Sequence, residues 1–135
     1  MRTSHRRLDS LKEKIAKRVE AARGWLVKTS AKDTEDRVFR LLGLKESGAT
    51  EKDIAAAAWE LLQTQQSDGG WAQIEKLDSD AYATGSALYA LRHAGGLKPD
   101  SPAFKAGVAF LLKTQQADGT WKVKSRSKPF QPYYE

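Results

Sequence analysis

Two aspartates, Asp78 and Asp80, stand two residues apart in front of a segment with helical periodicity, and Tyr82 follows them. Side chains of these types can donate or accept protons, so all three are candidate acid or base groups of a catalytic site. The same spacing also suits a structural role, because carboxylates at the start of a helix complement its dipole. We expect the structural role and keep the three residues as catalytic candidates.

Few other residues offer recognisable chemistry. The chain has no cysteine, which excludes disulfides and thiolate catalysis, and its two histidines are His5 and His93. Gly-rich phosphate loops and Ser–His–Asp orders are absent from the sequence. Tyr82, Arg126 or Tyr133 could act as lyase-type groups in a groove, although no spacing supports that role. We predict neither a metal ion nor a cofactor.

The strongest pattern is a repeat. LLQTQQSDGGW at 61–71 and LLKTQQADGTW at 111–121 agree at eight of eleven positions and lie 50 residues apart, which is typical of repeat architectures. The Asp-Gly pair predicts a turn after each helix. Gln65 and Gln115 precede Trp71 and Trp121 by six residues, so each amide can reach back across its turn while a buried indole covers it. We interpret the four residues as structural clasps between repeats, with ligand binding by the tryptophans as the alternative.

Five helices are expected around these motifs. They span 8–28, 34–43, 51 to the first QQ pair, 80–94, and 102 to the second QQ pair, with Asp33 or Thr34, Thr50 and Ser101 as N-caps and Gly43 as the end of the second helix. GWLVKTSAKD at 24–33 matches AFLLKTQQAD at 109–118 in part, so the first helix belongs to a degenerate repeat. The first, third and fifth helices are therefore equivalent, and the chain is predicted to be an all-α, alternating two-layer array.

The segment KAGVAFLLKTQQADGTW at 105–121 closely resembles the QW motif of squalene-hopene and oxidosqualene cyclases. SDAYATGSALYAL at 79–91 is similar to stretches of bacterial squalene-cyclase-like repeat proteins. This resemblance implies an α/α toroid, with Gln65, Trp71, Gln115 and Trp121 as clasps and segments 34–43 and 80–94 as inner helices. About two and a half helix pairs are present, so we expect a partial toroid.

The resemblance also implies where a catalytic acid would lie. Class II terpene cyclases of this kind protonate an alkene with an aspartate of a DxDD motif near the start of an inner helix. Here Asp80 takes the first acidic position, and Tyr82 and Ala83 take the other two; starting at Asp78 instead makes Asp80 the donor and places Ala81 at the last position. The zinc set of the related protein prenyltransferases needs a cysteine that this sequence lacks.

The charge distribution is uneven. Residues 1–28 hold nine Lys/Arg and three Asp/Glu, which equals the whole net charge of +6. This segment could contact phosphates or anionic lipid, but its apolar stripe at helical spacing favours a solvated polar face, and we do not expect nucleic acid as a partner. No run of about 18 apolar residues and no signal-peptide h-region occurs in the sequence, so a cytoplasmic or membrane-peripheral location is the default.

We therefore expect residues 1–135 to form a single segment of a toroid protein, with repeats at 51–71 and 102–121 and a truncated tail at 122–135. The complete protein is expected to bind or cyclise a polyisoprenoid or triterpenoid-like ligand, and the isolated segment is not expected to be catalytic. The alternative is a noncatalytic repeat scaffold that binds a peptide or glycan on its concave face. Missing repeats or self-association are expected to cover the apolar ends, including Phe130, Tyr133 and Tyr134.

Overall fold

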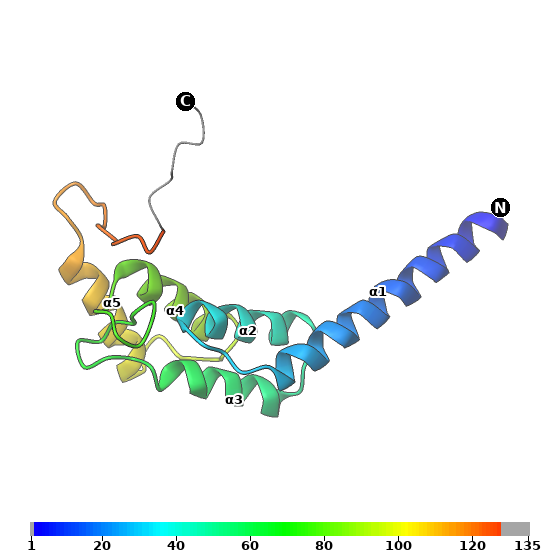
Figure 1. Ribbon diagram of the computed structural model, residues 1–135, viewed down its shortest axis with the longest axis horizontal. Helices are drawn as coiled ribbons and strands as arrows, with labels where there is room; N and C mark the ends of the chain where they lie inside the picture. Colours follow the sequence, from blue (N-terminus) through cyan, green and yellow to red (C-terminus); the bar gives the residue numbers. More distant parts are fainter. Residues whose placement is uncertain (1, 128–135) are drawn as a thin grey trace.

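The structure, a computed structural model, describes residues 2–127 and consists of five helices joined by loops (Figure 1). The expectations for Phe130, Tyr133 and Tyr134 lie outside the described residues. The helices are α1 (Arg2–Lys28), α2 (Thr34–Glu46), α3 (Glu51–Leu62), α4 (Ala81–His93) and α5 (Pro102–Thr114). Within residues 2–127, one antiparallel bridge, between Trp71 and Asp80, is the only extended pairing. The all-α prediction is confirmed.

Helices α2 and α4 pack against each other at the centre of the molecule, and the other three flank them. α3 packs against both, α5 packs against α4, and the C-terminal part of α1 packs on α2. The long N-terminal part of α1 leaves this body (Figure 1). The alternation of central and flanking helices is that of a partial α/α toroid, as predicted. Every helix in residues 2–127 is too short or too polar to cross a bilayer.

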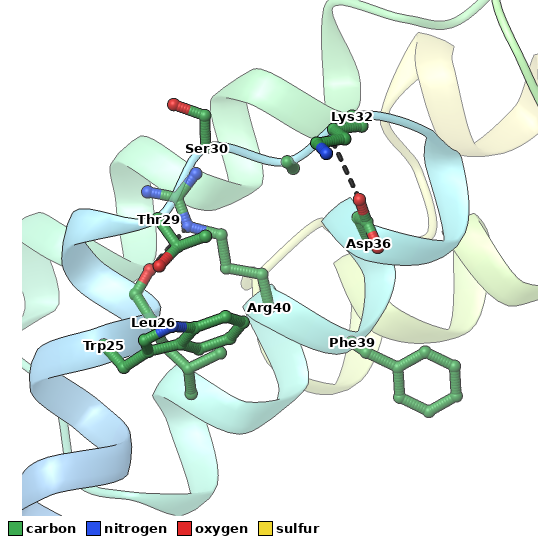
Figure 2. A pocket seen from close by; sticks show the side chains of 9 residues that line it. Trp25, Leu26, Thr29, Ser30, Lys32, Asp36, Phe39 and Arg40 are labelled. Atoms are coloured by element: carbon green, nitrogen blue, oxygen red, sulfur yellow. Dashed lines mark hydrogen bonds between the residues drawn. The ribbon is translucent and has the colours of Figure 1, made fainter.

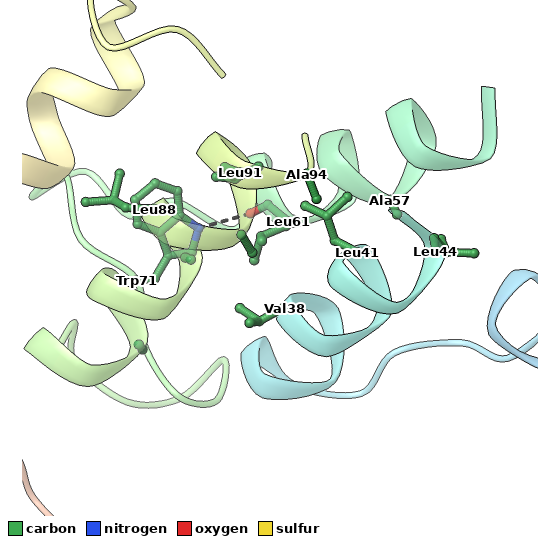
Figure 3. Close-up of a cluster of buried hydrophobic side chains, with 12 residues drawn as sticks. Val38, Leu41, Leu44, Ala57, Leu61, Trp71, Leu88, Leu91 and Ala94 are labelled. Atoms are coloured by element: carbon green, nitrogen blue, oxygen red, sulfur yellow. Dashed lines mark hydrogen bonds between the residues drawn. The ribbon is translucent and has the colours of Figure 1, made fainter. Parts of the chain in front are cut away.

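The core lies where the central helices meet α3 and the loop after it (Figure 3). Its fully buried large side chains come from α2, α3, α4 and that loop: Leu41, Leu44, Leu61, Trp71, Thr84 and Leu91. Arg40 of α2 joins the flanking helices to this core, because it donates to the Leu26 carbonyl of α1 and pairs with Glu60 of α3 at 2.7 Å.

Local signals predicted the starts of the helices better than their ends. Asp33, Thr50 and Ser101 each accept a backbone N–H as N-caps. The expectation that Gly43 ends the second helix is wrong, because α2 continues to Glu46 with Ser47 as C-cap. A Cβ at Gly43 would stand 2.8 Å from Cδ1 of Leu26, so this glycine allows α1 to pack closely on α2. The first helix also begins earlier than expected, at Arg2, and α3 ends at Leu62, before the QQ pair.

Candidate functional site

The two QW-type motifs share one local geometry. Nε2 of Gln65 donates to the Gly69 carbonyl at 2.8 Å, and Nε2 of Gln115 donates to the Gly119 carbonyl at 2.8 Å. Gln65 donates a second bond, of 2.9 Å, to the carbonyl of Ala103 in the first turn of α5. Among the described residues, Gln115 has no such bond to another helix. In the part of the chain that the structure describes, Gln65 thus bonds both within its own turn and to α5, whereas Gln115 bonds within its own turn.

The two tryptophans differ in burial although their indoles bond in the same way. Nε1 of Trp71 donates to the Leu61 carbonyl at 3.0 Å, and Nε1 of Trp121 donates to the Leu111 carbonyl at 2.8 Å. Trp71 is fully buried, whereas Trp121 is 40% exposed, so the expected burial holds only for Trp71. The difference arises because α4 lies against the first motif, where the Thr84 hydroxyl accepts from the Trp71 backbone N–H at 2.9 Å.

Asp80 lies at the N-cap of α4. Its Oδ1 accepts the backbone N–H of Ala83 at 2.8 Å, and its Oδ2 accepts from Nε2 of Gln73 at 2.8 Å. Asp78 is exposed in the preceding loop. Both carboxylate oxygens of Asp80 are thus occupied as hydrogen-bond acceptors, and one of them accepts an N–H group of the first turn of α4. This geometry is that of an N-cap.

The Asp80→Asn variant is therefore expected to unfold with a free energy within roughly half a kcal/mol of the original protein, because asparagine caps about as well as aspartate. Asp80→Ala is the matched control, which removes the cap and is expected to cost about 0.5 to 2 kcal/mol. Urea denaturation measures both. If Asp80→Asn abolished turnover of a polyprene by the complete protein while folding survived, the capping role would not be the whole role of Asp80.

Tyr82 is the second residue of α4, and its side chain reaches across to α2. Its hydroxyl donates to Oε1 of Glu35 at 3.1 Å, and this hydrogen bond, with the negative charge of Glu35, raises the pKa of Tyr82 above its usual value. Arg126 comes close from the C-terminal segment: its Nε donates to Oε1 of Gln73 at 2.9 Å, and its Nη2 lies 3.7 Å from Oδ2 of Asp33. The N-terminal ends of α2 and α4 thus share one polar cluster, around a cavity of about 70 Å³.

This polar cluster contains two of the three lyase-type candidates, Tyr82 and Arg126, while Tyr133 lies outside the described residues. Tyr82 has its hydroxyl committed to Glu35, and a tyrosine with a raised pKa is a weaker base catalyst at neutral pH. Within residues 2–127, no three His, Asp or Glu side chains converge as a metal site. The contacts of this cluster join the N-terminal ends of α2 and α4.

The outward surface of α2 and α4 carries aromatic side chains. Phe39, Tyr82 and Tyr89 are 61%, 52% and 58% exposed. The three rings lie on one surface because α2 and α4 run side by side and are joined near both ends. At one end Tyr82 bonds to Glu35, and at the other His93 lies 3.6 Å from Glu46. Phe39 stands between those two glutamates on α2 by helical spacing, and Tyr89 stacks on His93. We call Phe39, Tyr82 and Tyr89 the aromatic face.

An open pocket adjoins the aromatic face at Phe39 (Figure 2). It has a volume of about 530 Å³ and lies between the C-terminal end of α1, the connection that follows it and α2. The Trp25 ring and Leu26 form one wall, Phe39 stands on the other side, and Arg40 lies between them (Figure 2). The guanidinium of Arg40 is already occupied by Glu60 and by the carbonyls of Leu26 and Val27. The pocket therefore offers mainly apolar surface.

Several residues of this region could not be identified as site residues from the sequence. Phe39 and Tyr89 lie in ordinary helical patterns, and only the pairing of α2 with α4 brings them to one surface. Gln73 and Glu35 belong to no recognisable motif, yet Gln73 donates to Asp80 and Glu35 accepts from Tyr82. For Thr84 a signal did exist, because a polar residue in the apolar stripe of a helix indicates a buried hydrogen bond.

Comparison with known proteins agrees with this geometry. The family model of the squalene-hopene cyclase C-terminal domain matches residues 33–133. A drimenyl diphosphate synthase from Streptomyces showdoensis is 31% identical over 116 residues, which cover 80% of this chain and 21% of that protein. The chain thus spans about a fifth of the length of this relative. Its paired helices, its QW-type motifs and the match over most of its length show that the chain belongs to the family of squalene-hopene cyclase C-terminal domains.

Proposed function

We propose that this chain forms part of a terpenoid cyclase-like toroid whose complete form binds a polyisoprenoid or triterpenoid-like ligand against the aromatic face. The observation that carries the proposal is the exposure of Phe39, Tyr82 and Tyr89 on the central helices α2 and α4, which would be the inner helices of the complete toroid. Family membership supports the choice of ligand, as does a relative named for the synthesis of drimenyl diphosphate.

The aromatic face suits such a ligand for two physical reasons. Burying a large apolar side chain against a hydrocarbon contributes about 1.5 to 3 kcal/mol when burial is complete, and the three rings are each about half exposed in the free chain. Aromatic rings also attract cations, so they would stabilise the positive charge on a protonated alkene. The neighbouring apolar pocket at Trp25 and Phe39 would extend the binding surface.

In this proposal the described residues bind the ligand and do not supply its proton. Asp80 is held by two N–H donors at a helix start, and Asp78 points into solvent. The proton donor of a complete cyclase would then come from another part of the toroid.

The exposed surface of α5 and of the turn after it, at the end of the array away from α1, supports a toroid that continues beyond α5. Leu112 of α5 is 67% exposed and Trp121 is 40% exposed, and within residues 2–127 Gln115 has no counterpart of the bond that Gln65 makes to Ala103. We propose that a further repeat, or a second copy of the chain, covers this edge and provides the missing acceptor.

Radiolabelled farnesol, followed by equilibrium dialysis, is the probe that tests the binding surface. The double variant Phe39→Ala, Tyr89→Ala is expected to weaken binding at least about tenfold, because each half-buried ring contributes about 1 kcal/mol. Trp59→Ala is the matched control, since Trp59 is a 62% exposed aromatic on the flanking helix α3, and it should leave binding unchanged.

Equal binding by the double variant and the original chain would exclude the aromatic face as the ligand surface. If the chain did not bind farnesol but bound a peptide or an oligosaccharide through Phe39 and Tyr89, the result would favour the noncatalytic scaffold instead.

A further inference from the structure

The N-terminal part of α1 makes an isolated helical surface. Every residue from 6 to 22 is exposed, partial burial begins at Arg23, and Leu26 packs beside Gly43 of α2. At 1.5 Å per residue, this segment extends roughly 25 Å away from the body, as Figure 1 shows. Nothing within the described residues covers it.

This segment is amphipathic although it is exposed. Its apolar stripe consists of Leu8, Leu11, Ile15 and Val19, which are 53%, 48%, 59% and 38% exposed. At 100° per residue, basic residues border this stripe on both sides: Arg7, Lys14 and Arg18 on one, Lys12 on the other. The three acidic residues of the segment, Asp9, Glu13 and Glu20, lie farther round the helix. The charges nearest the apolar stripe are therefore positive on both of its sides.

We propose that residues 6–22 bind the surface of an anionic lipid bilayer, with the apolar stripe below the headgroups and the flanking cations among the lipid phosphates. A helix with an aliphatic stripe between two basic borders matches both properties of such an interface, its shallow apolar layer and its negative charge. This proposal depends on α1 alone and is independent of the ligand proposed for the aromatic face.

The charges beside the apolar stripe argue against two other occupants of this surface, a second copy of the chain and nucleic acid. A second copy packed along the same stripe would bring the bordering residues Arg7, Lys12 and Arg18 of both chains together, and like charges at such positions repel. Nucleic acid would attract the basic borders, but it would gain nothing from the exposed Leu11 and Ile15 between them. An anionic bilayer is favoured because it uses both features.

Flotation of the 135-residue chain with vesicles tests the proposal. We expect binding to a three-to-one mixture of phosphatidylcholine and phosphatidylglycerol, and much weaker binding to phosphatidylcholine alone or at high salt. Arg18→Glu should lower the partition coefficient at least about fivefold, the factor expected for one basic residue at an anionic surface. Lys17→Glu changes the net charge equally but lies opposite the stripe, so its effect should be clearly smaller.

A second pair of variants tests the stripe. Ile15→Asn should reduce binding, whereas Ala21→Asn, on the polar side of the helix, should not. Because these residues are all exposed, circular dichroism and the melting temperature of the body should be unchanged in each variant.

Three results would overturn the proposal. The first is no binding to anionic vesicles. The second is an equal loss of vesicle binding in Arg18→Glu and Lys17→Glu, no loss in Ile15→Asn, and binding of the chain to duplex DNA. This combination would indicate a purely electrostatic nucleic-acid surface. The third is a dimer in sedimentation without vesicles that Ile15→Asn converts to a monomer, which would identify a second copy as the occupant.

Discussion

Replacement of Trp71 with alanine is expected to lower the free energy of unfolding by about 3 to 5 kcal/mol, the usual cost of removing a buried aromatic side chain. Trp71 has no exposed surface, and its indole N–H bonds to the Leu61 carbonyl at the end of α3 (Figure 3). The substitution would therefore leave both a large cavity and a carbonyl without its partner.

Trp121→Ala is the matched control for this prediction. Trp121 makes the same bond, to the Leu111 carbonyl, but it is 40% exposed, so its loss is expected to cost only about 1 to 2 kcal/mol. Chemical denaturation of the two variants gives the comparison. Equal losses would mean that each motif stabilises only its own turn, and that Trp71 does not act as a clasp between repeats.

Gly69→Ala is expected to be the second strongly destabilising change, and Gly119→Ala is its matched control. Both glycines have a left-handed backbone, with φ of 88° and 86°, which costs an alanine about 1 to 2 kcal/mol. At Gly69 the new Cβ would also lie 2.6 Å from the Ala106 carbonyl oxygen of α5, whereas at Gly119 its nearest neighbour, Nε2 of Gln115, is 3.9 Å away.

The steric clash at Gly69 should lower the free energy of unfolding by about a further 1 to 3 kcal/mol, as overpacking usually does. It would also push α5 away from the turn that Gln65 joins to Ala103. Thermal melting should show a clearly larger fall for Gly69→Ala than for Gly119→Ala. If the two melting temperatures fell equally, α5 would move aside without cost, and the contact between the first turn and α5 would be too weak to hold the repeats together.

Local patterns in the sequence were sufficient to predict the helices, their N-caps and the repeated turn. Caps such as Thr50 and Ser101 act through N–H groups three residues away, so their roles follow from spacing alone. The QW resemblance likewise pointed to the family and to paired helices. Asp80 could be placed before a helix, although its bond from Gln73 comes from a loop whose path the sequence does not show.

What the sequence could not determine depends on contacts between segments distant in the chain. Trp71 and Trp121 stand in nearly identical motifs, and only the position of α4 makes one buried and the other half-exposed. The local pattern predicts a helix end at Gly43, yet the role of this glycine is set by Leu26 of another helix. The aromatic face exists because α2 and α4 pair along their lengths. Helix formation and capping are governed by neighbours within one or two turns, whereas burial depends on which distant surfaces meet, and that information enters only with the tertiary structure.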